Sequence, residues 1–330
     1  MVRYLLNVSY IGTAFRGVTF IQPYYRYRDL RTIQGVLENA VKCFFKKRCT
    51  VCCSSRTDAR VHALSSTFHI DVDREQLYGE EEKYEIIAAL NDNLKWQKAA
   101  VRINAINLVD ENSFEAYRNV ENRTYLYRLA VQWRGKPKEP PIEEIDRCFV
   151  VEDCDMNKFK IVAEMFVGKH DFRSFMQYSK EEKTKEACYS QRKIQSIKIE
   201  QSMPCVISST CDNYFQFYDI TFTANSYVYR QIRRIVGALC ALAQGRITER
   251  DIYELLTIPS FHTWDHLFRQ KQIETAPAYG LYFIGINYKP EEDWTLEPIE
   301  LSARGTRIKS FFDGDKQEKH GHQSEAHGAT

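Results

Sequence analysis

A charged loop between two strand-like runs is the feature that most constrains how this chain can fold. The run 50–53 is short and largely apolar and leads into the loop, while the run 64–70 is rich in strand-forming residues and leads out of it. Between them lies Asp58, with Arg56 and Arg60 on either side. Loops held between strands often present reactive side chains. Aspartate and serine are equally ordinary turn residues, so the local pattern alone favours a plain surface turn.

The composition is that of a globular chain and excludes few functions. With 330 residues and 44% hydrophobic content, the chain can form one large domain or two of ordinary size. A formal net charge of +2 does not by itself indicate a nucleic-acid binder. The ten cysteines show no disulfide-framework spacing and no signal peptide is recognisable, so we expect an intracellular, reducing environment with the organelle left open. No apolar run approaches the ~20 residues of a membrane span, so we expect no membrane contact.

Hydrophobic periodicity predicts alternating strands and helices in the first part of the chain. The expected elements are a strand at 3–10, a helix at 32–47, the two strands beside the charged loop, a helix at 82–93 and a strand at 101–108. Thr32 is the predicted N-cap of the first helix. This order suits a split antiparallel sheet with its helices on one side.

The second part of the chain gives a similar pattern. The expected elements are strands at 123–131, 193–200, 214–224 and 284–288, and helices at 155–167, 228–244 and 248–257. Prolines predict a linker loop at 134–144. The polar stretch 302–330 has too few apolar residues to form a core, so we expect it to be disordered.

The helix expected at 228–244 is the second informative element. Its apolar residues fall on one side at helical spacing, and Arg230, Arg233 and Arg234 gather on the opposite side. Such a charge cluster is most simply a solvated helix face. It is also a surface that suits phosphate groups, and the pattern alone does not exclude that use.

Two groups of residues have spacings that call for a check on metal binding. Cys49, Cys52 and Cys53 include half of a zinc motif, but no second pair follows at a usable spacing. His262 and His266 have the spacing of two ligands on one helix, yet they lack a third partner. Buried thiols are common packing residues. We therefore expect no metal site.

Several segments, in a fixed order along the chain, together resemble one known family. The segments are Arg-Thr-Asp-Ala-x-Val-His-Ala at 56–63, Arg-Thr-Tyr-Leu-Tyr-Arg-Leu at 123–129, Gly-x-His-Asp-Phe-x-x-Phe at 168–175, Tyr-Arg-Gln-Ile-Arg-Arg-Ile-Val-Gly at 229–237 and Ala-Pro-x-x-Gly-Leu at 276–281. This set resembles the TruA-type tRNA pseudouridine synthases. The similarity is greatest to the eukaryotic pseudouridine synthase-like branch.

The resemblance implies a fold and an arrangement of domains. The fold class is α+β, with two similar halves whose antiparallel sheets join into one extended sheet, helices on one face and a central basic cleft. Residues 1–109 would form the half with the catalytic loop, and residues 110–289 would complete the active site. Residues 290–330 would be a polar, disordered tail.

The resemblance also implies the reaction, which is the isomerisation of uridine to pseudouridine in the anticodon arm of tRNA. It needs no cofactor and no metal, its macromolecular partner is tRNA, and the family implies a homodimer. Asp58 would be the essential catalytic group, as nucleophile or as base, and Arg233 would pair with it and keep it ionised. Tyr125 and Leu281 would complete the site. The implied RNA-binding residues are Arg56, Arg60, Arg230 and Arg234.

Arg60 departs from the family pattern, which has glycine at this position. Glycine there implies a positive φ or a close backbone approach. A positive φ would cost arginine roughly 1–2 kcal/mol. This departure favours one alternative function, a non-catalytic tRNA-binding or folding protein that keeps the cleft. A third alternative is a structural or scaffold protein without salt-dependent RNA affinity. Because the rest of the loop motif is intact, we expect activity to be retained.

Overall fold

A computed structural model describes seven stretches of the chain. These are residues 2–19, 31–72, 80–110, 113–133, 139–178, 190–205 and 214–289. All of them belong to the compact unit Met1–Pro290. The predicted tail 290–330 lies outside the described residues.

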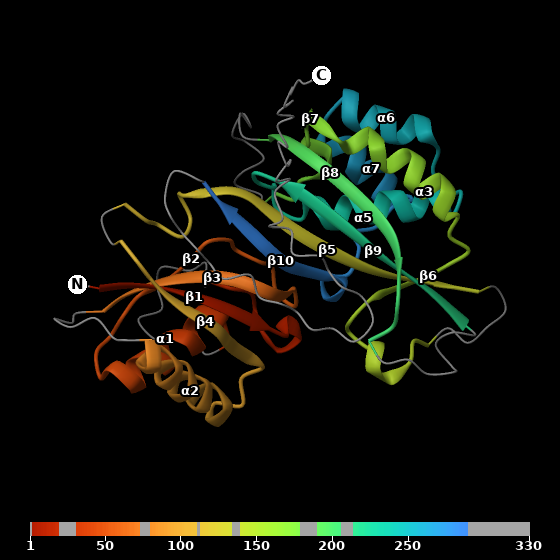
Figure 1. The fold of residues 1–330 in the computed structure, drawn as a ribbon. Coiled ribbons are helices and arrows are strands. Elements are labelled where there is room, and N and C mark those ends of the chain that lie inside the picture. Colours follow the sequence, from red (N-terminus) through yellow and green to blue (C-terminus); the bar gives the residue numbers. More distant parts are fainter. Residues whose placement is uncertain are drawn as a thin grey trace, which may run out of the picture. The chain divides into compact units, whose positions relative to one another are not determined.

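A ten-stranded sheet forms the centre of this unit (Figure 1). Its strands are β1 (Val2–Tyr10), β2 (Val51–Cys53), β3 (His62–Val72), β4 (Val101–Val109), β5 (Val120–Gln132), β6 (Phe149–Glu152), β7 (Gly168–Asp171), β8 (Gln191–Ser202), β9 (Phe215–Ala224) and β10 (Leu281–Tyr288). The order is β4-β1-β3-β10-β5-β9-β8-β7, with β2 paired to β3 and β6 paired to β5. The prediction of an α+β fold with one extended sheet is confirmed.

The last strand joins the two parts of the sheet. β10 runs parallel to the start of β3, where Tyr282 pairs with His62 and Phe283 with Ala63, and it runs antiparallel to β5. β1, β3 and β4 pair antiparallel on one side, and β5, β9, β8 and β7 do so on the other. This junction places the residues that follow the charged loop directly beside the strand that begins at Leu281.

Helices cover the sheet over both parts. They are α1 (Ile33–Phe45), α2 (Glu80–Trp96), α3 (Met156–Ala163), α5 (Gln231–Ala243), α6 (Glu249–Thr257) and α7 (Phe261–Arg269), with α1 and α2 beside β1–β4 and the others beside β5–β9 (Figure 1). The side chain of Thr32 accepts a hydrogen bond from the Gly35 amide, so the predicted N-cap is confirmed. α7 was not predicted.

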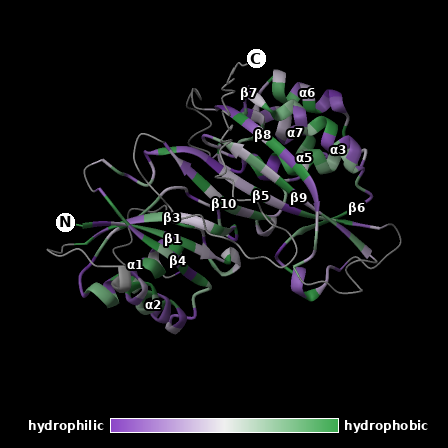
Figure 2. Cartoon of the chain, in the orientation of Figure 1, coloured by the Kyte–Doolittle hydropathy of each residue, from purple (hydrophilic) through white to green (hydrophobic). Residues whose placement is uncertain are grey.

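The larger of the two apolar clusters among the described residues packs along both parts of the sheet. It takes Leu6, Val8 and Phe68 from the first part, Tyr127 and Leu239 from the second, and continues through the strands between them. In Figure 2 β8 mixes hydrophobic and hydrophilic residues, and α3 and α6 show both colours, as helices with one side in water do. None of the described helices is both long enough and apolar enough to span a bilayer.

The helix predicted at 228–244 needs a correction. α5 begins at Gln231, after Arg230 adopts a left-handed conformation with φ of 63°. Every residue of α5 is buried except Arg233, so the helix has no solvated arginine face. The reason is tertiary, because α5 lies among α3, α6 and α7 beside the sheet and neighbours cover it on several sides (Figure 1).

Candidate active site

The charged loop is held against the segment that follows β1. The Arg60 amide donates to the Phe15 carbonyl at 3.2 Å, and the Val18 amide donates to the Thr57 carbonyl at 3.3 Å. Gly12 lies so close to the loop that a Cβ atom there would fall on the Val61 carbonyl. The loop is therefore a fixed part of the first half and not a free surface turn.

Asp58, in the loop between β2 and β3, meets Arg233 on α5. An Arg233 Nη atom lies 3.3 Å from an Asp58 carboxylate oxygen, with side-chain exposures of 11% and 21%. A second contact orients the guanidinium, since Arg233 Nε donates to the Ala276 carbonyl at 2.8 Å. The Ala276 amide in turn donates to the Arg233 carbonyl at 3.0 Å. The first turn of α5 and the start of the 276–281 segment thus aim Arg233 at the loop.

Burial dominates the electrostatics of this pair. It raises the pKa of Asp58 above the ordinary aspartate value, and the positive charges of Arg233 and Arg230 only partly oppose the rise. Burial likewise lowers the pKa of Arg233. Arg233 acts on the pKa of Asp58 in the expected direction, toward the ionised carboxylate, but it offsets only part of the desolvation.

Tyr125 packs beside the base of the same loop. Its hydroxyl lies 3.1 Å from Ser55 Oγ, and its ring makes contacts with Tyr227 and Phe283 at centroid distances of 5.2 and 4.9 Å. Burial raises the pKa of Tyr125 to about 12, so the phenol is neutral at physiological pH. Leu281 is buried as the first residue of β10 and pairs with β5.

Arg56 and Arg230 are two of the predicted RNA-binding arginines. Arg56 is exposed on the loop. Arg230 is half-buried, its guanidinium lies 5.2 Å from the Tyr229 ring centroid, and its charge acts on Asp58. Its Nε atom is buried without a hydrogen-bond partner among the described residues.

Arg234 does not fit the RNA-binding prediction. Its guanidinium is buried and donates to the carbonyls of Ser174 and Met176 at 3.1 and 2.8 Å. It also lies 4.6 Å from the Trp264 ring centroid. Burial lowers the pKa of Arg234 to about 10. These contacts give Arg234 an internal, structural role, because Trp264 and the 174–176 segment cover the side of α5 that we expected to face solvent.

Arg60 has the positive φ that its departure from glycine implied. Its φ is 69°, in the left-handed region. Its guanidinium pairs with Asp146 at 3.0 Å and lies 5.6 Å from the Tyr279 ring centroid. The side chain remains about half exposed, at 52%, so phosphate contact by Arg60 stays a prediction.

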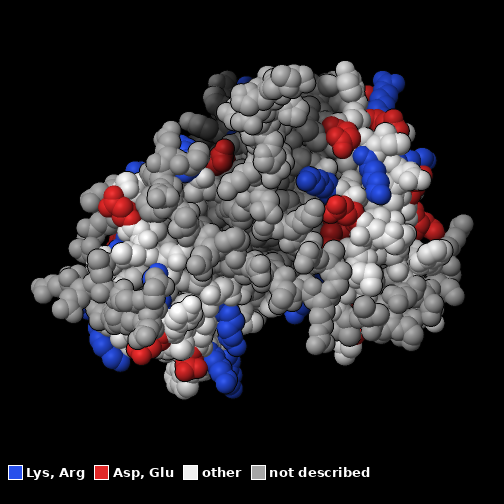
Figure 3. All heavy atoms as spheres, viewed as in Figure 1, with Lys and Arg blue, Asp and Glu red and all other residues white. Residues whose placement is uncertain are grey.

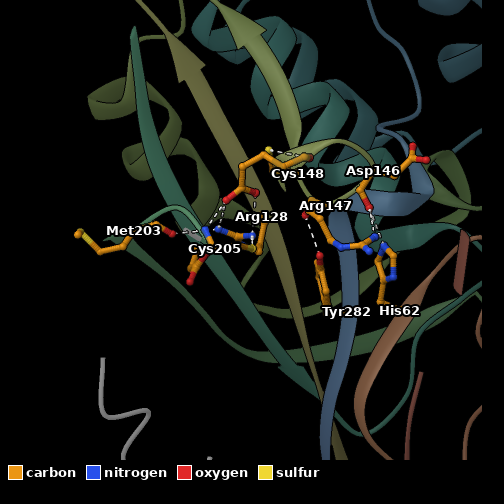
Figure 4. A network of polar contacts seen from close by, with 10 residues as sticks. His62, Arg128, Asp146, Arg147, Cys148, Met203, Cys205 and Tyr282 are labelled. Carbon is orange, nitrogen blue, oxygen red and sulfur yellow. Dashed lines mark hydrogen bonds and ion pairs between the residues drawn. The ribbon is translucent and has the colours of Figure 1, made fainter. Parts of the chain in front are cut away.

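His62 was missed as a site residue, although it lies inside the loop motif. It is fully buried, its Nδ1 accepts from the Gly12 amide at 3.1 Å, and its Nε2 donates to the Asp146 carbonyl at 3.1 Å. Its ring stacks on Tyr282, whose hydroxyl donates to the Arg147 carbonyl (Figure 4). Burial and the Arg147 charge lower the pKa of His62 to about 4, so the ring is neutral.

A buried ion pair anchors the segment that His62 contacts. Arg128 on β5 binds Glu144 at 3.0 Å, and Glu144 is fully buried (Figure 4). Arg128 also donates to the Met203 carbonyl at 3.0 Å, and the Cys205 amide donates to Glu144. The part of the predicted linker that the structure describes is therefore tied to the sheet, and removing the Arg128 charge would leave the Glu144 carboxylate buried without this ion-pair partner.

The described residues contain no group of three or more His, Cys, Asp or Glu side chains placed to hold a metal ion. On the face seen in Figure 3, the described Lys and Arg side chains are interspersed with Asp and Glu. The predicted basic cleft therefore stays a prediction.

Comparisons with known proteins agree with the resemblance. A profile of the tRNA pseudouridine synthase family matches residues 162–289. Human tRNA pseudouridine synthase-like 1 is 31% identical over 291 residues, which cover 87% of this chain and 90% of that protein. The Xenopus laevis protein of the same name is 29% identical over 301 residues, covering 88% and 92%. tRNA pseudouridine synthase A of Caulobacter sp. (strain K31) is 26% identical over 293 residues, covering 88% and 100%. The chain belongs to the tRNA pseudouridine synthase family.

Proposed function

We propose that this protein isomerises uridine to pseudouridine in the anticodon arm of tRNA, with Asp58 as the essential group. The observation that carries the proposal is the Asp58–Arg233 pair, in which a carboxylate on the family's loop meets a cation from α5 at 3.3 Å. The names of the relatives support tRNA as the substrate. The anticodon arm and a homodimer rest on the family resemblance.

The chemistry requires a carboxylate in a partly dry site. Uracil must leave C1′ of its ribose, rotate, and reattach through C5, so the base is first taken out of its stack into a pocket. A carboxylate can attack C1′ or remove a proton from the sugar, and both roles need the ionised form. One bond to C1′ breaks and another forms, without electron or phosphoryl transfer, so the reaction needs no cofactor.

Other residues have proposed roles around the flipped base. The neutral Tyr125 ring would stack on the uracil, and Leu281 would supply an apolar wall. Arg56, exposed on the loop, would occupy the space that the base leaves in the RNA stack. Arg230, which is half-buried beside Tyr229, would contact phosphate. Residues 1–109 and 110–289 would be the two halves that enclose the RNA.

The test compares the wild-type protein with Asp58→Ala on the same unmodified tRNA transcripts. Pseudouridine is mapped by uridine-specific carbodiimide chemistry. Asp92→Ala is the matched control, since Asp92 is an exposed aspartate on α2. We expect product from the wild type and the control, and none from Asp58→Ala. Thermal unfolding of all three proteins checks that each is folded.

A non-catalytic tRNA-binding protein would give a different result. It would bind tRNA with the salt dependence of phosphate contacts and yield no pseudouridine from any variant. That outcome, with all proteins folded, would reject the enzymatic function.

A further inference from the structure

Arg123, near the start of β5, binds two separate segments of the active site. One Nη atom donates to the Asn225 carbonyl at 2.6 Å, and the other donates to the Ser54 carbonyl at 2.9 Å. The guanidinium also lies 5.5 Å from the ring centroid of Tyr117, which is 66% exposed. A single side chain therefore joins backbone from the first part of the chain to backbone from the second.

The two carbonyls begin the segments that carry the candidate catalytic pair. Ser54 opens the loop that leads to Asp58, and Asn225 opens the turn that leads from β9 to Arg233 on α5. Both carbonyls lie just beyond strand ends, where the sheet ladder gives them no regular partner. The two Nη atoms of Arg123 thus fix the distance between these two irregular segments at the point where each segment begins.

Other hydrogen bonds join β5 to the same two segments. The Tyr125 hydroxyl bonds Ser55 on the loop side, and the Tyr227 hydroxyl donates to the Arg123 carbonyl at 3.3 Å on the turn side. The Asn225 side chain donates to the Glu121 carbonyl at 2.7 Å. β5 therefore lies between the loop and the turn and contacts both.

We propose that Arg123 is a positioning residue that fixes Asp58 relative to Arg233 without touching the substrate. The inference deepens the proposed function and rests on it for its kinetic consequences. Arginine suits the task because its planar guanidinium donates in two directions at a fixed spacing, whereas a lysine ammonium is a single point donor. A positive charge at this position would not hold both carbonyls unless its donors had this planar, two-directional geometry.

The kinetic test separates positioning from RNA contact. Arg123→Met keeps the aliphatic stem, Arg123→Lys keeps the charge, and Arg118→Gln removes a neighbouring exposed arginine whose side chain pairs with Glu115. We expect Arg123→Met to lower kcat by about tenfold to a hundredfold with KM within about twofold, because small misplacements of reacting groups are costly. Arg123→Lys should lose most of the same kcat, and Arg118→Gln should lose none. A raised KM with unchanged kcat would make Arg123 an RNA contact and reject the inference.

Hydrogen–deuterium exchange tests the positioning without relying on activity. In Arg123→Met, and to a lesser degree in Arg123→Lys, amides in 54–61 and in 225–230 should exchange faster together, while Arg118→Gln should match the wild type. Faster exchange in only one segment, or in neither, would reject the inference. If wild-type protein made no pseudouridine, the proposed function would fail, and the exchange result would still decide whether Arg123 joins the two segments. Arg123→Lys serves for both measurements if Arg123→Met does not fold.

Discussion

Arg233 reaches Asp58 at 3.3 Å, yet the pKa of Asp58 lies above the ordinary aspartate value. A fully solvated ion pair would show the opposite shift. Desolvation exceeds the attraction because the two groups share one long contact in a partly dry site, so the cations offset only part of the cost of burying the ionised carboxylate.

Arg233→Gln should move the acid limb of the activity profile to higher pH. Activity needs the ionised carboxylate, so it rises as pH passes upward through the folded-state pKa of Asp58. Arg233 is the largest influence that lowers this pKa, and its removal raises it further. We would measure kcat/KM from about pH 4 to about pH 8, which spans the range of shifted carboxylates. Arg233→Lys, which keeps the charge, should move the limb less. An unmoved limb in Arg233→Gln would show that the cation does not control ionisation of Asp58.

Tyr125→Phe should keep more activity than Tyr125→Leu. Phenylalanine preserves the ring contacts with Tyr227 and Phe283 and loses only the hydrogen bond to Ser55, which is worth about 1 kcal/mol. Leucine removes the stacking surface as well. Single-turnover rates on tRNA would compare the two variants. If Phe were as damaging as Leu, the phenol proton and not the ring would be the functional part.

Local signals explain what could be predicted from the sequence. Apolar periodicity and a helix N-cap such as Thr32 are signals that come from the same few residues as the element they predict. The sequence therefore predicted α1, the strands beside the charged loop, and the order of strands and helices in the first part. The family pattern placed Arg233 opposite Asp58, which no local signal could do.

Partners that are distant in sequence explain what could not be predicted. Arg234 has the spacing of a helix-face cation, but it is covered by Trp264 and by the segment around Ser174. His62 reads as an ordinary strand residue until Gly12 and Asp146 are brought to its two ring nitrogens. In both cases the residues that contact the side chain are brought there by tertiary packing, and hydrophobic periodicity within a short window does not report such contacts.

Substitutions at Arg60 should separate backbone strain from the ion pair. Arg60→Gly relieves roughly 1–2 kcal/mol of left-handed strain. The substitution also costs about 0.5–1 kcal/mol of stability because glycine loses more backbone entropy on folding. Loss of the exposed ion pair with Asp146 costs about 0.2–1 kcal/mol more. Its unfolding free energy should therefore stay within about 1 kcal/mol of wild type, while Arg60→Ala, which keeps the strain and loses the pair, should be the less stable of the two variants.

The activity of Arg60→Gly should stay close to that of the wild type. The Arg60 side chain is directed at Asp146 and Tyr279, and its backbone conformation is one that glycine adopts freely. Turnover on tRNA is the measurement. A rise of about a hundredfold would mean that Arg60 holds the native loop in an impaired conformation.

His62 should make the fold sensitive to acid. Its pKa falls from an ordinary value near 6.5 to about 4, so the unfolded chain binds the proton more readily than the folded one. Stability is then complete above about pH 6.5 and declines as pH falls toward about 4, by at most about 3 kcal/mol. Denaturant unfolding at a series of pH values would measure this decline. His62→Phe should flatten it, and an identical slope in both proteins would assign the acid sensitivity to other groups.

Gly237→Ala should destabilise the protein, although alanine ordinarily favours a helix interior by about 1 kcal/mol over glycine. A Cβ atom at Gly237 would fall on the Glu274 carbonyl and lie 3.2 Å from the Ala276 amide nitrogen. α5 or the 274–276 backbone would have to shift, at a cost of about 1–3 kcal/mol. Because Ala276 orients Arg233, kcat should fall as well.

Gly285→Ala is the matched control, since nothing lies within 4 Å of the added atom and its stability should match or exceed that of the wild type. Denaturant unfolding and turnover would be measured on both variants. A Gly237→Ala protein with full stability and full kcat would show that the position of Arg233 does not depend on the close contact between α5 and the 274–276 backbone.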